Sequence, residues 1–285
     1  MSSVPRVFAS QLVASLKLVA PVDLVDVVRA LGLEIRYCEA SGFDGALVCS
    51  KANHVGTVLV KKSIRELGRR KFTIAHEIAH YVLPHHGATG SVCSSREVEN
   101  WDRSLPSEEI EANVFAGELL VPETLVDPDV RNQPPAMSAI RALSTKFETS
   151  LTAAAYRTMQ LTPFRAAIVW STAGVVRWFK ASSEFEAFVS VRQPVAQGTY
   201  AYDSFKGLTV PDDLKSVKSD LWLASSGGKN PDYILEQSVP IPFYDSVLTL
   251  LRIEQVGHSL RDDEEGVLDE LNPQDFTLGR RKWPR

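Results

Sequence analysis

Two histidines and a glutamate carry the clearest chemical signal in this sequence. His76-Glu77-Ile78-Ala79-His80 has the pattern H-E-x-x-H. Residues four apart lie on the same face of a helix, so His76 and His80 can hold one zinc ion. Zinc lowers the pKa of a bound water to about 7, and a neighbouring carboxylate can accept the proton. The pattern therefore predicts zinc-dependent hydrolysis, with Glu77 as the general base.

The residues around this motif predict the helix that it requires. No proline or glycine interrupts residues 69–83, and Pro84 ends the predicted helix just after Leu83. Apolar residues recur at helical spacing at Phe72, Ala75, Ile78, Ala79 and Val82. The alternative is an ordinary amphipathic helix with two surface histidines.

A catalytic zinc needs a third protein ligand, and two residues compete for this position. His86 gives the longer spacing H-E-x-x-H-x-x-G-x-x-H, except that Leu83 stands where a glycine would make the sharp turn. Glu109 lies on a second predicted helix that begins at Ser107, and it is the preferred ligand. Asn113, one turn later, can orient a ligating histidine.

The same helix carries two further acidic residues on a different stripe. Glu111 shares that stripe with Glu118, and we expect Glu111 to face solvent. His85 and His86 fall in a predicted irregular loop over residues 84–105, and we expect both to be exposed to solvent.

Two blocks of sequence resemble the ImmA/IrrE family of zinc peptidases. The first is Arg70 to His80, and the second runs from Glu109 through Asn113-Val114-Phe115-Ala116 to Leu119-Leu120-Val121-Pro122. Val121 replaces the methionine that is usual in the family, and the resemblance covers roughly residues 1 to 160. It implies a gluzincin-like peptidase with Zn²⁺ as cofactor. Known members cut helix-turn-helix repressors and so switch on stress or mobile-element genes.

Composition favours an intracellular enzyme. The chain has 285 residues, of which 44% are hydrophobic, and this can form one or two cores. The sequence shows neither a secretory signal nor a long apolar run, which predicts a cytoplasmic protein without membrane contact. The three cysteines lack C-x-x-C spacing and are expected to be reduced thiols. A net charge of -4 gives no general attraction to nucleic acid.

Before the zinc helix, the pattern predicts two helices and a small sheet. The helices are expected at 7–19 and 22–30, and the strands at 33–37, 46–49 and 56–60. An extended substrate can add to an exposed sheet edge, and Thr57 to Lys61 is the predicted edge strand.

After a linker at 127–135, two helical patterns at 137–147 and 151–160 have the form of a helix-turn-helix. The second begins with Thr152-Ala153-Ala154-Ala155, which offers few side chains that can read bases. Packing is therefore preferred over sequence-specific DNA binding for this pair.

The remaining sequence predicts a smaller α+β domain. A hairpin is expected at 166–170 and 175–179, a helix at 183–189, and strands at 221–224, 233–237 and 246–253. Some ImmA/IrrE members carry a ligand-sensing GAF-like domain at this position. The predicted organisation is α+β, with a peptidase domain at 1–135, the helical pair at 136–163, the C-terminal domain at 164–256 and a flexible tail at 257–285.

Two classes of function fit these observations. In the first, a zinc endopeptidase inactivates a repressor by cutting it. In the second, the protein is a regulator that binds a repressor or DNA without cleavage. The intact Glu77 favours the enzyme, since a purely structural zinc site needs no base.

Overall fold

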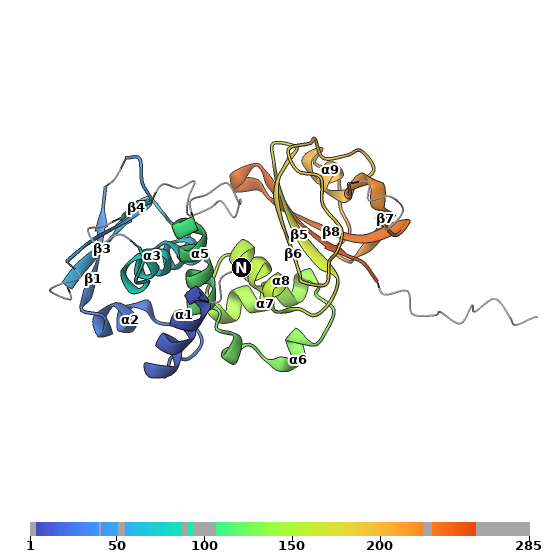
Figure 1. The fold of residues 1–285 in the computed structure, drawn as a ribbon. Helices are drawn as coiled ribbons and strands as arrows, with labels where there is room; N and C mark the ends of the chain where they lie inside the picture. Colours follow the sequence, from blue (N-terminus) through green and yellow to red (C-terminus); the bar gives the residue numbers. More distant parts are fainter. Residues whose placement is uncertain are drawn as a thin grey trace, which may run out of the picture. The chain divides into compact units, whose positions relative to one another are not determined.

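The structure is a computed structural model that describes residues 4–39, 41–50, 55–86, 91–93, 107–224 and 230–254. These residues form a mixed α+β protein with two β-sheets, drawn in Figure 1, as the sequence predicted. By their contacts, the described residues up to Ile253 form one compact unit. The domain boundaries at 135, 163 and 256 stay predictions. The predicted tail at 257–285 lies outside the described residues.

The N-terminal part contains a four-stranded sheet with the order β1-β3-β2-β4. Its strands are β1 Leu33–Cys38, β2 Gly45–Ser50, β3 Val55–Lys61 and β4 Ser91–Cys93. The β-branched Val58 and Val60 are fully buried on β3, where such side chains pack well on a pleated surface. The first three strands confirm the predicted ones, and Cys38 and Cys49 are free thiols.

Strand β3 lies inside this sheet, so the prediction that Thr57 to Lys61 forms an edge was wrong. β3 pairs in parallel with β1 on one side and antiparallel with β2 on the other. β2 also pairs with β4, which leaves β1 and β4 at the edges of the described sheet. The apolar pattern identifies a buried strand, but it carries no information on the order of strands in space.

The described helices include the one that the H-E-x-x-H motif requires. They are α1 Val4–Ser15, α2 Leu24–Ala30, α3 Leu67–Val82, α5 Ser107–Leu120, α6 Pro128–Arg131, α7 Met137–Phe147, α8 Leu151–Leu161 and α9 Tyr200–Phe205. Helix α3 packs on β2 and β3, and α5 packs along α3. At the end of α3, Leu83 is already extended before Pro84, as predicted. None of the described helices is long and apolar enough to cross a membrane.

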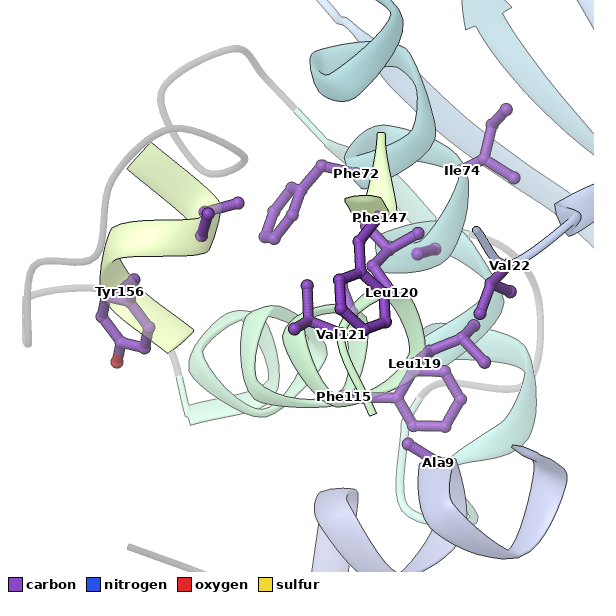
Figure 2. Close-up of a cluster of buried hydrophobic side chains, with 14 of the residues drawn as sticks. Ala9, Val22, Phe72, Ile74, Phe115, Leu119, Leu120, Val121, Phe147 and Tyr156 are labelled. Atoms are coloured by element: carbon purple, nitrogen blue, oxygen red, sulfur yellow. The ribbon is translucent and has the colours of Figure 1, made fainter. Parts of the chain in front are cut away.

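One hydrophobic core joins the N-terminal helices to the helical pair. In Figure 2, Phe115 and Leu119 of α5 pack near Ala9, while Phe72 and Phe147 extend the cluster toward α7 and α8. The residues of α8 from Ala153 to Arg157 are buried. Because this run faces the protein interior, the structure favours the packing role that we predicted for the pair.

A buried ion pair fixes α8 against α5. Arg157 is 1% exposed, and its Nη2 donates to Glu118 Oε2 at 2.5 Å. Its Nε also donates to the carbonyl oxygen of Val121 at 2.9 Å. Glu118 is 3% exposed, although the sequence placed it on the same stripe as Glu111, for which we expected a solvent-facing position. A helical stripe shows which residues share a face, but not which face another helix covers.

The C-terminal part is a five-stranded antiparallel sheet with the order β6-β5-β9-β8-β7. Its strands are β5 Ala166–Thr172, β6 Val175–Ala181, β7 Lys215–Lys218, β8 Tyr233–Ile241 and β9 Ser246–Arg252. Successive side chains alternate between its faces. Leu248 and Leu250 join the core shared with the helices, whereas Val247 and Leu251 join a second core. Both faces of the sheet are therefore buried.

Two predicted elements of this part were wrong. Residues 183–189 form no helix, and residues 221–224 form no strand. Leu221 ends a short 3-10 helix at Ser219–Leu221, and Leu223 makes an isolated bridge with Val189. Phe185, Val189 and Trp222 are all buried in the second core. Their apolar character reflects this burial rather than regular secondary structure. Helix α9 and strand β7 were not predicted.

Candidate metal centre

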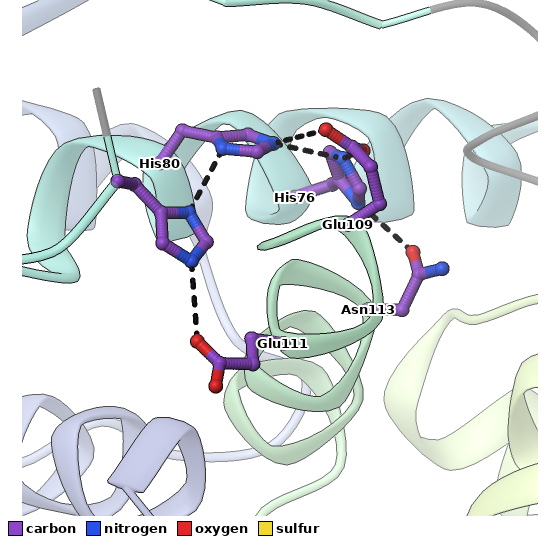
Figure 3. A network of polar contacts seen from close by, with 6 residues as sticks. His76, His80, Glu109, Glu111 and Asn113 are labelled. Carbon is purple, nitrogen blue, oxygen red and sulfur yellow. Dashed lines mark hydrogen bonds and ion pairs between the residues drawn. The ribbon is translucent and has the colours of Figure 1, made fainter. Parts of the chain in front are cut away.

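Helices α3 and α5 bring together the three residues that the sequence predicted as metal ligands. His76 and His80 come from α3, and Glu109 comes from the first turns of α5, as Figure 3 shows. One ligand atom from each residue lies within 4.8 Å of the other two. The two imidazoles are almost fully buried, and the Glu109 side chain is 14% exposed.

The distances between these atoms fit a zinc ion. His76 Nε2 lies 3.2 Å from His80 Nε2 and 2.9 Å from Glu109 Oε2. His80 Nε2 lies 3.5 Å from Glu109 Oε1. Tetrahedral zinc with bonds of about 2.0–2.1 Å separates its ligand atoms by about 3.3–3.4 Å. The residues can therefore surround zinc with small adjustments, and two histidines and a carboxylate are a common set for catalytic zinc.

Asn113 orients the first histidine, as the sequence suggested. Its Oδ1 lies 2.9 Å from His76 Nδ1 and accepts the hydrogen bond from that nitrogen. Asn113 is 2% exposed, and it lies one turn after Glu109 on α5. A proton held on Nδ1 leaves the lone pair of Nε2 for a metal, so this contact selects the tautomer that zinc needs.

The charges and hydrogen bonds at these residues favour the binding of a cation. Burial alone would lower the pKa of His76, but its hydrogen bond to Glu109 and the nearby charges of Glu77 and Glu109 raise it above 6.5. Burial alone would raise the pKa of Glu109, but hydrogen bonds from His76 and His80 hold it far below 4.5. Glu109 is therefore ionised at neutral pH, as a metal ligand must be.

Glu77, the predicted general base, is completely buried on α3 beside strand β2. Gly45 begins that strand, and a Cβ atom at Gly45 would lie only 2.7 Å from Glu77 Oε1. It would also lie 2.5 Å from Thr73 Cγ2. The absence of a side chain at Gly45 gives Glu77 its space, which the sequence reasoning missed because the contact joins separate elements.

His86, the rival third ligand, lies on the other side of His80. Its Nδ1 is 2.9 Å from His80 Nδ1, whereas the candidate metal ligand of His80 is Nε2. The structure therefore groups Glu109, rather than His86, with the two histidines of the motif. His86 is 3% exposed, so the prediction of an exposed histidine was wrong for this residue.

Glu111 also differs from its prediction, because it contacts histidines instead of facing solvent. Its Oε2 lies 3.4 Å from His86 Nε2 and is in contact with His85 Nε2, and its side chain is 20% exposed. Burial first, and then His80, lower the pKa of His86 below 6.5, so this ring is neutral at pH 7. The spacing along α5 gave no sign of these contacts, because the histidines belong to the segment that follows α3.

Comparisons with known proteins agree with this arrangement. Residues 28–159 match the family described as Peptidase M78, IrrE N-terminal-like domain. A comparison with curated proteins found no match. Among solved structures, a Mycobacterium tuberculosis transcriptional regulator is similar in fold, with a TM-score of 0.52 and 12% sequence identity. The match covers 88% of this chain and 77% of that protein.

The family match spans the chain from α2 to α8 and includes all four predicted site residues. The family is one of metallopeptidases, which agrees with the two histidines and the glutamate that the fold brings together. Residues 28–159 thus match an IrrE N-terminal-like domain, and this match supports the assignment to the ImmA/IrrE family.

Proposed function

We propose that the protein is a zinc endopeptidase that cuts a helix-turn-helix transcriptional repressor in the cytoplasm. Cleavage would release stress or mobile-element genes from repression. The observation that carries the peptidase assignment is the close approach of His76, His80 and Glu109, with separations of 2.9 to 3.5 Å. The repressor as substrate is supported by the family resemblance.

In this proposal, His76, His80 and Glu109 hold the metal, and Glu77 moves the proton. When bound by these residues, zinc would act as a Lewis acid that polarises the scissile carbonyl and lowers the pKa of the attacking water. The Glu77 carboxylate accepts a proton from that water and delivers it to the nitrogen of the leaving amine. Asn113 keeps the His76 ring in place during the reaction. We describe the centre as gluzincin-like, because its third ligand is a glutamate from a second helix.

The sheet offers a place for an extended substrate. Strand β4 is an edge of the described sheet, and its neighbour β2 carries Gly45 beside Glu77. A peptide that adds to β4 would satisfy backbone hydrogen bonds along its length. We therefore assign the substrate edge to β4 instead of Thr57 to Lys61. The C-terminal sheet is the proposed GAF-like, ligand-sensing part of the molecule.

The test uses the purified, zinc-loaded protein and a helix-turn-helix repressor encoded beside its gene, where the genome carries one. We expect Glu77→Gln to retain zinc and to reduce cleavage by about 100-fold or more, because the base is lost and the ligands remain. Glu109→Ala should lose zinc along with activity. Mass spectrometry of the fragments and metal analysis of each variant give the two readouts.

The same experiment separates the alternative function. If the zinc form leaves the repressor intact but releases it from its operator, the protein is a regulator that acts by binding. Cleavage by Glu77→Gln at the wild-type rate would contradict the proposed role of the base.

A further inference from the structure

A second group with the same donor types lies beside the metal centre. His85, His86 and Glu111 offer two imidazoles and one carboxylate, and one ligand atom from each lies within 4.8 Å of the others. The His86 side chain is fully buried, Glu111 is 20% exposed and His85 is 48% exposed. The group is therefore anchored in the protein and reaches solvent through His85.

The geometry of this group suits a divalent ion. His86 Nε2 and Glu111 Oε2 are 3.4 Å apart, close to the separation of about 3.3–3.4 Å between ligands of tetrahedral zinc. His85 Nε2 contacts the same carboxylate oxygen. A metal here would take the place of the protons that now join the carboxylate to the rings. The donor set has the same charge as that of His76, His80 and Glu109.

A direct contact between two rings links the two groups. His80 Nδ1 and His86 Nδ1 are 2.9 Å apart, a hydrogen-bond distance that requires one proton between them. When His80 binds a metal through Nε2, its proton is on Nδ1, and His86 Nδ1 must accept it. The proton of neutral His86 is then on Nε2, where it points at Glu111. Metal on His80 thus completes a chain of hydrogen bonds that ends at a carboxylate.

Metal on His86 has the opposite effect. Binding through His86 Nε2 shifts the single ring proton to Nδ1, which faces the Nδ1 proton of a metal-bound His80. Two N–H groups at 2.9 Å repel each other, and neither can accept. Simultaneous occupation of both groups therefore requires the rings to separate.

We propose that His85, His86 and Glu111 form a second zinc site, and that zinc in it weakens zinc binding at His76, His80 and Glu109. This inference rests on the metal centre of the proposed function. Coupling between two binding sites is reciprocal, so each zinc weakens the other by the same factor. Excess zinc would therefore inhibit the protein by binding to His85, His86 and Glu111.

The test is a titration of the metal-free, full-length protein with zinc alone, in competition with a chromophoric chelator. The wild type should bind two equivalents, the second more weakly. His85→Gln, and independently Glu111→Gln, should bind only the first. His76→Ala should lose the tightly bound zinc. It should bind the remaining zinc about tenfold more tightly than the wild type binds its second zinc, because no metal on His80 then holds a proton against His86 Nδ1. Glu184→Gln, which removes an exposed acid in the C-terminal part, is the control.

The outcomes distinguish the two sites. One equivalent in the wild type, unchanged by His85→Gln, would overturn the second site and leave the first intact. If the wild type binds two equivalents, but the zinc that remains in His76→Ala binds no more tightly than the second zinc of the wild type, the antagonism is overturned. Retention of the tight equivalent in His76→Ala would instead refute the metal centre of the proposed function. Circular dichroism of each variant verifies the fold.

Discussion

At the scale of single residues, a glycine determines whether Glu77, the proposed general base, can occupy its position. Gly45 has an ordinary backbone conformation, so its requirement is one of space rather than of backbone freedom. Any side chain there would collide with Glu77 Oε1 and Thr73 Cγ2, at 2.7 and 2.5 Å from the Cβ atom. The contact involves the base and spares the metal ligands.

Gly45→Ala should therefore reduce cleavage without affecting zinc binding. The added methyl group displaces the Glu77 carboxylate, and we expect cleavage to fall about tenfold or more, since general-base catalysis depends on geometry within hydrogen-bond reach. Zinc affinity should stay close to that of the wild type. Gly117→Ala on α5 is the control, because a Cβ atom there meets nothing within 4 Å. Equal cleavage by both variants would contradict this role of Gly45.

The sequence predicted the residues that α3 and α5 bring together, including Asn113, and missed the contacts made by other segments of the chain. His76, Glu77, His80 and Glu109 follow from helical spacing within α3 and α5, which is local information. Gly45 and the His86–Glu111 contact depend on which elements meet, and each of these contacts joins separate segments of the chain. No periodicity within one segment reports such a meeting.

At the scale of elements, the buried pair of Arg157 and Glu118 holds α8 to α5. Both side chains are nearly inaccessible to solvent, so each charge depends on the other for compensation. Removal of one partner leaves an uncompensated charge in the interior, whereas replacement of both by apolar residues does not.

Arg157→Met should lower the free energy of unfolding by about 3–5 kcal/mol, the usual cost of breaking a buried pair. The double variant Arg157→Met with Glu118→Leu should recover most of this loss, because no buried charge remains. Chemical denaturation of the three proteins measures both effects. A double variant less stable than Arg157→Met would show that the pair stabilises the fold by itself.

A buried carboxyl makes the C-terminal sheet sensitive to pH. Burial raises the pKa of Glu236 above 4.5, although hydrogen bonds from Trp222, Ser238 and the backbone of Ala201 oppose the shift. A raised pKa in the folded state means that the fold prefers the neutral acid. The stability from this group is complete below pH 4.5 and is lost as pH rises through the raised pKa.

The difference in unfolding free energy between the wild type and Glu236→Gln should therefore shrink as pH rises above 4.5 and through the raised pKa of Glu236. The glutamine amide cannot ionise. Its NH₂ group faces N–H donors that donate to the carboxyl group of Glu236 in the wild type, so the variant is the less stable protein at low pH. Urea denaturation followed by tryptophan fluorescence gives both curves. A constant difference over this range would exclude Glu236 as the source.

Individual helices and strands were predicted more accurately than the order of the strands in a sheet, for a physical reason. Helix α7 and strand β5 both follow from local apolar patterns, and capping confirms the pair at Ser150, whose Oγ accepts from Ala153 N at 3.1 Å. The order of strands depends on long-range pairing, so the interior place of β3 was out of reach. The buried, irregular residues around Phe185 look like an element because they are apolar.

At the scale of the whole molecule, one core extends across the predicted boundary at residue 163. Buried side chains of α8, such as Met159, share this core with Ile168 of β5 and with Leu248 and Leu250 of β9. Helix α8 itself packs on β5 and β6. The peptidase part therefore depends on the C-terminal sheet to cover its last helix.

A chain that ends at residue 163 should lose cooperative unfolding and aggregate, since it exposes the core face of α8. A chain of residues 1–253, the compact unit, should unfold in one transition. Calorimetry and size-exclusion chromatography compare the two. A soluble, cooperatively folded 1–163 fragment would show that the peptidase part is autonomous.

The shared core affects how the protein folds during synthesis on the ribosome. Synthesis proceeds at roughly 5–20 residues per second, so the interval between α8 and β9 lasts roughly 4–17 s. During this interval both metal-binding helices have been made, but the strand that carries Leu248 and Leu250 has not. We expect nascent chains to present the apolar face of α8 to chaperones at this stage, and the finished core to form only after release of β9 from the exit tunnel.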